Sequence, residues 1–309
     1  MSQVSGDVWS PVITPFVADL APDEQRFVAH CQWLASNGVG LAVFGTNSEA
    51  NSMTVAEKQA LLQALVDGGI DPARVMPGTG NCAIDDCVSL TRAAVEAGCA
   101  GVLMLPPFYY KGVSDEGLFR YYSEVINRVA DSRLRIYLYH IPPVTQVPLS
   151  LELIERLRDA FPGIIAGIKD SGGDWAHTQA LTERFAGQDF AVYAGSERFL
   201  LDTLRAGGAG CISATANVNP AAIVELARHW QEGDADERQQ RLNVVRDLFE
   251  TYPLIPAMKA ATAYFSGIND WRRLRPPLVE LDDQRTAELM SALKATGFQM
   301  QGVGEARHG

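Results

Sequence analysis

The sequence predicts an α/β protein, a (β/α)8 (TIM) barrel with a C-terminal helical extension. Three observations support this fold class. Short apolar runs rich in β-branched residues recur eight times along the chain. Segments with helical periodicity separate these runs, and only helical patterns follow in residues 234–309. Strict alternation of strands and helices is typical of a parallel sheet with helical crossovers, and eight such units suggest a sheet that closes on itself.

The eight expected strands are almost continuously apolar, without the alternation of a strand that faces water on one side. Strands covered by helices on both faces have this character. We expect them at residues 8–16, 40–46, 75–80, 101–106, 135–142, 164–170, 190–195 and 210–216.

Helices are expected between the strands. The second begins with Thr54 and Glu57, whose spacing is that of a capping box, in which each side chain satisfies a backbone amide of the other. Glycines at the ends of several helices, such as Gly38 and Gly98, accept the left-handed closing conformation. The predicted barrel helices span residues 23–37, 54–67, 83–97, 114–130, 150–160, 175–186, 197–206 and 220–231, and those of the extension span 235–249, 255–266 and 282–296.

The expected organisation is a catalytic barrel in residues 1–233 and a helical extension packed on it in residues 234–309. Barrels of this type usually need roughly 250 residues. An open, doubly wound sheet is the competing fold. It is disfavoured because no Gly-x-Gly-x-x-Gly pattern follows the first strand.

The net charge of the chain restricts the classes of partner that it is expected to bind. Lysine and arginine together number 26, against 37 aspartates and glutamates, so the net charge is −11. A chain this acidic should be repelled by the phosphates of nucleic acids. No apolar run reaches the roughly 20 residues of a membrane-spanning helix, and the first residues show no secretory signal. We therefore expect a cytoplasmic protein that binds neither nucleic acid nor membrane.

The cysteines indicate no metal site. Their number is odd and no two are spaced as Cys-x-x-Cys, nor do the histidines cluster near them at zinc spacing. Reduced thiols, mostly buried, are the expected state. The five are Cys31, Cys82, Cys87, Cys99 and Cys211.

Of the five lysines, only Lys169 ends an otherwise apolar strand. Active sites of (β/α)8 barrels lie at the carboxyl ends of the strands. Gly167, on the same face, is expected to leave open room beneath the amine. Burial favours the neutral amine, which is the form that attacks a carbonyl carbon to give a Schiff base. The alternative is a structural ion pair with Asp170 or Glu49.

Polar residues at neighbouring strand ends could assist this lysine. Tyr139 is expected at the same level on the preceding strand, where its phenol could relay a proton, although a core tyrosine bonded to the backbone is the commoner case. The turn at Thr46, Asn47 and Ser48 offers hydroxyls and backbone amides to a small anion such as a carboxylate. His140 has no second metal ligand in view, so a supporting role is expected.

Together these segments resemble the dihydrodipicolinate synthase / N-acetylneuraminate lyase superfamily. The resemblance covers nearly the whole chain, and four of its segments fall at strand ends in register with the eightfold pattern. The matching segments are PVITPF (11–16), GTNSE (45–49), YHIP (139–142), GIKDS (167–171), ISATANV (212–218) and LRPPL (274–278).

The resemblance implies a class I lyase that acts on pyruvate or a related 2-keto acid and an aldehyde, as a homotetramer without metal or organic cofactor. Lys169 would form the imine and Tyr139 would relay protons. Thr46 and Asn47 would bind the keto-acid carboxylate. Further expected site residues are Tyr110, or Tyr109 beside it, reaching across a subunit contact, and the backbone groups of Gly195 and Ile212 lining the pocket.

Departures from the synthase pattern bear on the substrate. Asn47 replaces the second threonine of the loop, which resembles the 4-hydroxy-2-oxoglutarate aldolase branch, and Ser48 replaces a glycine. Val144 stands where the synthases place the arginine that holds the aldehyde's carboxylate. An aliphatic side chain cannot make that bidentate contact, so aspartate semialdehyde is disfavoured as the partner.

Four alternatives stay open. Within the family, the chain could be a 4-hydroxy-tetrahydrodipicolinate synthase or a dehydratase of a sugar-derived keto acid. It could also be a binder of keto acids without turnover. A phosphate-binding barrel enzyme is suggested by the glycines at 207, 208 and 210, but these precede the eighth strand, opposite the usual site.

Overall fold

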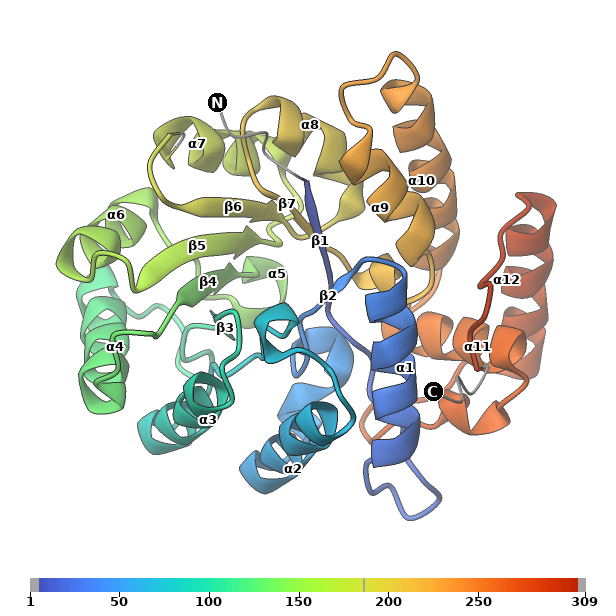
Figure 1. Ribbon diagram of the computed structural model, residues 1–309, viewed down its shortest axis with the longest axis horizontal. Helices are drawn as coiled ribbons and strands as arrows, with labels where there is room; N and C mark the ends of the chain where they lie inside the picture. Colours follow the sequence, from blue (N-terminus) through green and yellow to red (C-terminus); the bar gives the residue numbers. More distant parts are fainter. Residues whose placement is uncertain (1–5, 186, 305–309) are drawn as a thin grey trace.

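In the part of the chain that the structure describes, seven parallel strands form one curled sheet with helices around its outside (Figure 1). The structure is a computed structural model that describes residues 6–185 and 187–304. Neighbouring strands follow the order β2-β1-β7-β6-β5-β4-β3. The strands are β1 (Asp7–Ser10), β2 (Gly40–Leu41), β3 (Val102–Met104), β4 (Ile136–His140), β5 (Ile165–Asp170), β6 (Ala191–Ala194) and β7 (Gly210–Ile212).

The expected strand at residues 75–80 is not a regular strand, although it occupies the gap between β2 and β3. It forms isolated parallel bridges to both, from Val75 to Leu41 and from Gly78 to Leu103. The amide of Leu103 also donates to the carbonyl of Pro77 at 2.9 Å. Pro77 has no amide hydrogen to give, which explains why the ladder is interrupted here. The segment therefore links the two edges of the sheet.

The helices follow the predicted pattern with few departures. The capping box is confirmed: the Glu57 amide donates to the Thr54 hydroxyl at 3.2 Å, and the Thr54 amide donates to the Glu57 carboxylate at 2.8 Å. The helices around the sheet are α1 (Glu24–Ser36), α2 (Val55–Asp67), α3 (Ile84–Glu96), α4 (Asp115–Val129), α5 (Pro142–Thr145), α6 (Leu151–Ala160), α7 (Trp175–Phe185), α8 (Leu200–Arg205) and α9 (Pro220–Arg228).

Three details differ from the prediction. The segment 197–206 starts as a 3-10 helix, Glu197–Phe199, before α8. Helix α9 ends at Arg228, before the predicted residue 231. The short helix α5 was not predicted. It starts at two prolines, whose fixed φ suits the first turn of a helix. Residue 186, the predicted end of α7, lies outside the described residues.

The inner and outer faces of the sheet have separate cores. On the outer face, apolar side chains of the strands pack against the surrounding helices. The inner face carries a small cluster of its own, which consists of Ala42, Met76, Leu103, Tyr193 and Ile212. Because Lys169 is in register with Tyr193, it belongs to the inner face, at the carboxyl end of the strands.

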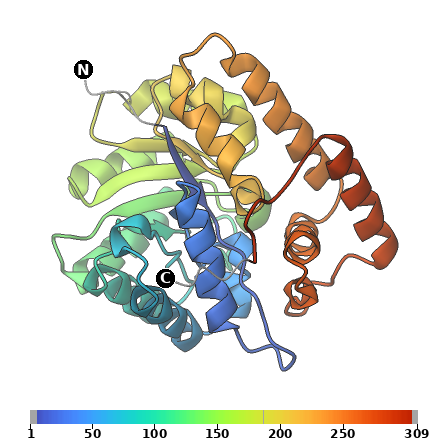
Figure 2. The same ribbon diagram turned by 45° about the vertical axis from the view of Figure 1, so that its right-hand side comes forward.

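Helices α10 (Ala235–Glu250), α11 (Leu254–Ser266) and α12 (Asp283–Ala295) lie together on one side of the sheet (Figures 1 and 2). Two buried ion pairs connect them to loops at the carboxyl ends of strands. Lys259 of α11 contacts Glu49 at 2.5 Å, and Arg246 of α10 contacts Glu197 at 3.1 Å. Burial lowers the pKa of Lys259 to about 8, while the charge of Glu49 acts to raise it.

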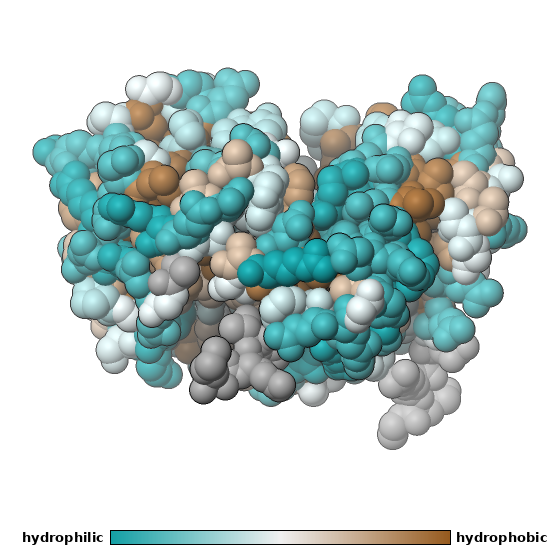
Figure 3. Space-filling view, turned by 90° about the horizontal axis from the view of Figure 1, so that it is seen from above, coloured by the Kyte–Doolittle hydropathy of each residue, from teal (hydrophilic) through white to brown (hydrophobic). Residues whose placement is uncertain are grey.

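In the space-filling view, hydrophilic residues cover most of the visible face, and apolar residues form small separate patches (Figure 3). None of the helices in the described part of the chain is long and apolar enough to cross a membrane.

Replacing Glu57 by glutamine is expected to destabilise the protein in a pH-dependent way. Hydrogen bonds from Arg275, at 2.5 and 3.1 Å, lower the pKa of Glu57 to about 2. A carboxyl group whose pKa is lowered by folding stabilises the protein above its ordinary pKa of 4.5 and loses that contribution as the pH falls toward 2. At pH 7 we expect a loss of about 1 kcal/mol, because the carboxylate is partly exposed and screened by water.

Urea unfolding between pH 8 and pH 4 measures this effect, and Glu116→Gln, at an exposed ion pair with Arg120, is the control. The difference between wild type and Glu57→Gln should be constant above about pH 5 and shrink below it. A difference that stays constant down to pH 4 would contradict the assignment. The control should change stability little at any pH.

Candidate active site

A cavity of about 420 Å³ opens at the carboxyl ends of the strands. The loop after β2 and the ends of β4, β5 and β6 form one wall, and residues of α10 and Leu254, the first residue of α11, form the other. Five residues predicted from the sequence line it: Thr46, Asn47, Tyr139, Lys169 and Gly195.

Lys169 and Tyr139 face each other in this cavity. The two residues are in register on β5 and β4, and both are buried, with 2% and 3% of their surface exposed. The amine of Lys169 donates to the phenol oxygen of Tyr139 at 3.2 Å. The same oxygen lies 3.4 Å from the hydroxyl of Thr46. Amine, phenol and hydroxyl thus form a chain along which a proton can move.

Both carboxylates that could have neutralised Lys169 have other partners. Glu49 contacts Lys259, as described above. Asp170 accepts hydrogen bonds from the hydroxyl of Thr178 at 2.6 Å and from His177 at 3.1 Å. Within residues 6–185 and 187–304, Lys169 forms no ion pair, so the structural alternative considered for it is wrong.

The space beneath Lys169 is filled, contrary to the expectation from Gly167. A Cβ atom at Gly167 would lie 2.3 Å from the carbonyl oxygen of Ala191 and 2.8 Å from the ring of Tyr137. The glycine therefore allows β5 to approach β6 and Tyr137 closely. The open room lies above the amine, in the cavity.

The loop carrying Thr46 and Asn47 is held by buried hydrogen bonds. Thr46–Ser48 form a 3-10 turn. The hydroxyl of Ser48 donates to the carbonyl of Val12 at 2.5 Å and accepts from the amide of Gly45 at 3.1 Å. A glycine at position 48 could form neither bond, because it has no hydroxyl. The serine thus fixes the turn from within.

Three predicted site residues do not line this cavity. Ile212 is buried in the inner cluster of the sheet. Val144 on α5 is 58% exposed and Tyr110 is 74% exposed. Tyr109 is equally exposed and packs edge-on against Tyr110, with ring centroids 5.3 Å apart. Both tyrosines thus present their rings at the surface of this chain.

Sequence reasoning missed His177, which lies behind the site next to His140, the histidine for which a supporting role was expected. The rings of His140 and His177 stack at 4.5 Å beside Asp170, and ligand atoms of the three residues lie within 4.8 Å of one another. Burial lowers the pKa of His140 to about 4, and the hydrogen bond to Asp170 raises that of His177. His140 Nδ1 accepts from the amide of Leu149 at 3.1 Å, so these groups form a hydrogen-bonded support for the end of β5.

The far wall of the cavity was also missed. Glu250 on α10 accepts hydrogen bonds from Arg246 at 2.7 Å and from Arg198 at 2.8 Å, and all three residues line the cavity. Burial alone would lower the pKa of Arg246, but the charges of Glu197 and Glu250 outweigh it and raise the pKa. The i,i+4 spacing of Arg246 and Glu250 was the available signal. This spacing does not predict that α10 lies next to the cavity.

Comparisons with known proteins agree with this architecture. The family model of the dihydrodipicolinate synthetase family matches residues 4–296. An uncharacterized DapA-like lyase of Chloroflexus aurantiacus is 35% identical, covering 92% of this chain and 94% of its own. The 4-hydroxy-tetrahydrodipicolinate synthase of Agrobacterium fabrum is 32% identical, covering 93% and 97%.

Solved structures show the same fold. Dihydrodipicolinate synthase from Agrobacterium tumefaciens superposes with a TM-score of 0.86 at 34% identity, covering 94% of this chain and 99% of that one. The prophage protein YagE of Escherichia coli, in complex with pyruvate, gives 0.86 at 29% identity, covering 95% and 99%. Fold and relatives together define a lyase or aldolase on a parallel β/α scaffold. The chain belongs to the dihydrodipicolinate synthetase family.

Proposed function

We propose that this protein is a class I lyase in which Lys169 forms a Schiff base with a pyruvate-like 2-keto acid. The observation that carries the proposal is the buried amine of Lys169, which faces the phenol of Tyr139 in a cavity and has no carboxylate partner in the described part of the chain. The pyruvate bound to the relative YagE supports this substrate class. Residues 1–233 would form a closed (β/α)8 barrel, and residues 234–309 its extension.

The chemistry starts with attack of the neutral amine on the keto carbon. A proton moves through Tyr139 to the developing alkoxide, and the carbinolamine then loses water as the C–O bond breaks to give the iminium. Tyr139, which gives its proton to the leaving water, then takes the proton of the C4 hydroxyl while the iminium accepts the electron pair of the C3–C4 bond. An aldehyde leaves, an enamine remains, and protonation at C3 followed by hydrolysis frees pyruvate and the amine. Condensation is the reverse sequence.

Other predicted residues receive roles that fit their positions. Thr46 and Asn47 would bind the carboxylate of the keto acid, with Thr46 also extending the proton relay from Tyr139. Gly195 would present backbone to the substrate. Since the side chain of Ile212 is buried, only its backbone groups could take part.

The exposed tyrosines support an assembly. We propose that Tyr110, or its neighbour Tyr109, reaches the cavity of a second copy in a homotetramer built as a dimer of dimers. A large aromatic side chain that is 74% exposed at the carboxyl end of a strand is costly to leave in water. Sedimentation of the wild type and of Tyr110→Ala tests this arrangement.

The second substrate is proposed to be a small aldehyde, as in the 4-hydroxy-2-oxoglutarate aldolase branch, with Asn47 in the loop and Val144 in place of an arginine. Ser171 and Ser196, which line the same cavity as Lys169, favour a second candidate, an aldolase or dehydratase of a hydroxylated sugar acid. The putative 2-dehydro-3-deoxy-D-gluconate aldolase YagE, 31% identical, points the same way. A panel of 2-keto acids, with pyruvate release coupled to a dehydrogenase, separates these from a 4-hydroxy-tetrahydrodipicolinate synthase, which needs aspartate semialdehyde.

Borohydride reduction in the presence of pyruvate tests the central proposal. The expected result is irreversible labelling of the peptide that contains Lys169, seen by mass mapping, with loss of activity. An active protein whose Lys169 peptide stays unlabelled would overturn the proposal. Labelling without exchange of the pyruvate methyl protons would instead indicate a keto-acid binder.

A further inference from the structure

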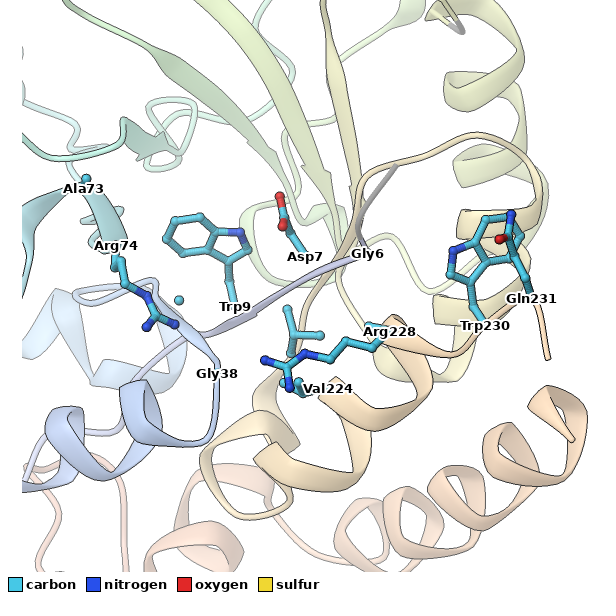
Figure 4. A pocket seen from close by; sticks show the side chains of 13 residues that line it. Gly6, Asp7, Trp9, Gly38, Ala73, Arg74, Val224, Arg228, Trp230 and Gln231 are labelled. Atoms are coloured by element: carbon cyan, nitrogen blue, oxygen red, sulfur yellow. The ribbon is translucent and has the colours of Figure 1, made fainter. Parts of the chain in front are cut away.

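A second cavity, of about 430 Å³, lies at the opposite end of the strands from Lys169. It is formed where β1 and β2 begin, beside the loop that follows α1 and the end of α9 (Figure 4). The residues that line it include Asp7, Trp9, Gly38, Arg74, Arg228 and Trp230. None of its lining residues is shared with the cavity at Lys169.

Two arginines converge in this cavity. In Figure 4 the side chains of Arg74 and Arg228 come from opposite sides and both point toward the space beside Gly38. Nη2 of Arg228 lies 2.8 Å from the position of a Cβ atom at Gly38, and Nη2 of Arg74 donates to the carbonyl of Val39 at 3.1 Å. The two guanidinium groups are thus placed around adjacent residues of one loop.

These arginines are not neutralised as most others in this acidic chain are. Among residues 6–185 and 187–304, neither Arg74 nor Arg228 forms a salt bridge with a carboxylate, and the side-chain hydrogen bonds of Arg74 go to backbone carbonyls. Asp7 also lines the cavity, and its carboxylate accepts a hydrogen bond from Tyr193 at 3.3 Å. Among the described residues that line the cavity, two arginines stand against one carboxylate, in a chain whose net charge is −11.

Arg74 and Arg228 also have N–H donors that the contacts described here do not use. Arg74 donates to the carbonyls of Ala35 and Val39, and Arg228 stands in the last turn of α9, where a cation suits the helix dipole. A guanidinium carries five N–H donors, so these roles use only part of what the pair offers. A phosphate or carboxylate accepts such donors in bidentate geometry.

The aromatic wall of the cavity completes the site. A Cβ atom at Gly40 would lie 2.4 Å from the indole of Trp9, so the glycine lets this ring lie flat against the start of β2. We propose that this cavity is a second ligand site, which binds a small anion with a phosphate or carboxylate group between Arg74 and Arg228 beside Trp9.

Calorimetric titration with inorganic phosphate and, separately, with malonate tests the proposal at constant ionic strength. We expect wild type to bind at least one of the two, and the tighter one identifies the anionic group. Arg228→Gln should weaken binding about tenfold or more, since it removes charged hydrogen bonds. Arg241→Gln, an exposed arginine on α10, is the matched control and should bind like wild type. Binding should also change tryptophan fluorescence, and Trp9→Phe should lose that change.

The result also separates this site from the proposed active site. Saturating pyruvate should leave the affinity for the anion unchanged, because the two cavities share no lining residue. Competition by pyruvate would place the anion at Lys169 and overturn the proposal. Equal weakening by Arg228→Gln and Arg241→Gln, or no binding of either anion up to about 10 mM, would overturn it as well. None of these outcomes depends on turnover.

Discussion

Replacing Lys169 by methionine or arginine is expected to reduce turnover of the keto acid on the order of 10⁴-fold or more, as when the nucleophile of a covalent mechanism is removed. Neither side chain can form an imine. Arginine keeps the charge of the ammonium form, so its failure would show that the amine itself is needed. Coupled assays of pyruvate release measure the rate, and borohydride labelling with pyruvate should disappear in both variants.

The fold should survive the methionine replacement. The amine of Lys169 contacts the phenol of Tyr139, and in the described part of the chain no carboxylate loses a partner when the amine is removed. We therefore expect the melting temperature to stay the same or rise, because a buried polar group is replaced by an apolar one of similar length. Lys294→Met, on the exposed side of α12, is the control and should keep full activity. Residual activity near wild type in Lys169→Met would contradict the mechanism.

The alternation of strand side chains was enough to predict the central contact of the site. Lys169 and Tyr139 were expected at one level on neighbouring strands, and the register of β4 and β5 confirms it. This worked because parallel strands bring their carboxyl ends together. Apolar runs likewise predicted seven of the eight expected strands, although each of the seven is shorter than its run. The run at 75–80 differs because Pro77 has no amide hydrogen to donate to a ladder, so that only isolated bridges form.

The far wall of the cavity could not be predicted, because it depends on how the extension packs. The i,i+4 spacing of Arg246 and Glu250 on a polar helix is typical of an ion pair exposed to solvent. The fold turns Arg246 inward, where it contacts Glu197 and is only 7% exposed. His177 was likewise hidden, since its pairing with Asp170 depends on the loop between β5 and α7.

The choice of partners for the acidic residues shapes the site as much as the lysine does. From the sequence, Glu49 and Asp170 were both candidates to neutralise Lys169. In the fold, Lys259 of α11 forms an ion pair with Glu49. Thr178 and His177 of α7 form hydrogen bonds with Asp170. A buried amine facing a carboxylate would be held in its charged form. Because side chains of the extension and of α7 pair with both carboxylates, the amine of Lys169 contacts the phenol of Tyr139 instead.

Replacing Tyr139 by phenylalanine is expected to lower kcat by about 10²- to 10⁴-fold, the usual contribution of a positioned proton donor and acceptor. The phenol oxygen lies 3.2 Å from the amine of Lys169 and 3.4 Å from Thr46, so its loss breaks the proton chain while the nucleophile stays in place. KM should change less than kcat, because the phenol acts on the proton transfers rather than on the keto-acid carboxylate.

The labelling reaction distinguishes this role from a structural one. In Tyr139→Phe, borohydride should still trap pyruvate on Lys169, but the trapped adduct should form more slowly than in wild type, because carbinolamine dehydration also needs the proton. Tyr122→Phe is the matched control, since Tyr122 is a buried tyrosine outside the cavity whose phenol donates to the Met104 carbonyl at 3.4 Å, and it should trap and turn over like wild type. If Tyr139→Phe traps pyruvate at the wild-type rate and keeps its kcat, another group carries the proton, and Thr46 is then the nearest candidate on the same chain of contacts.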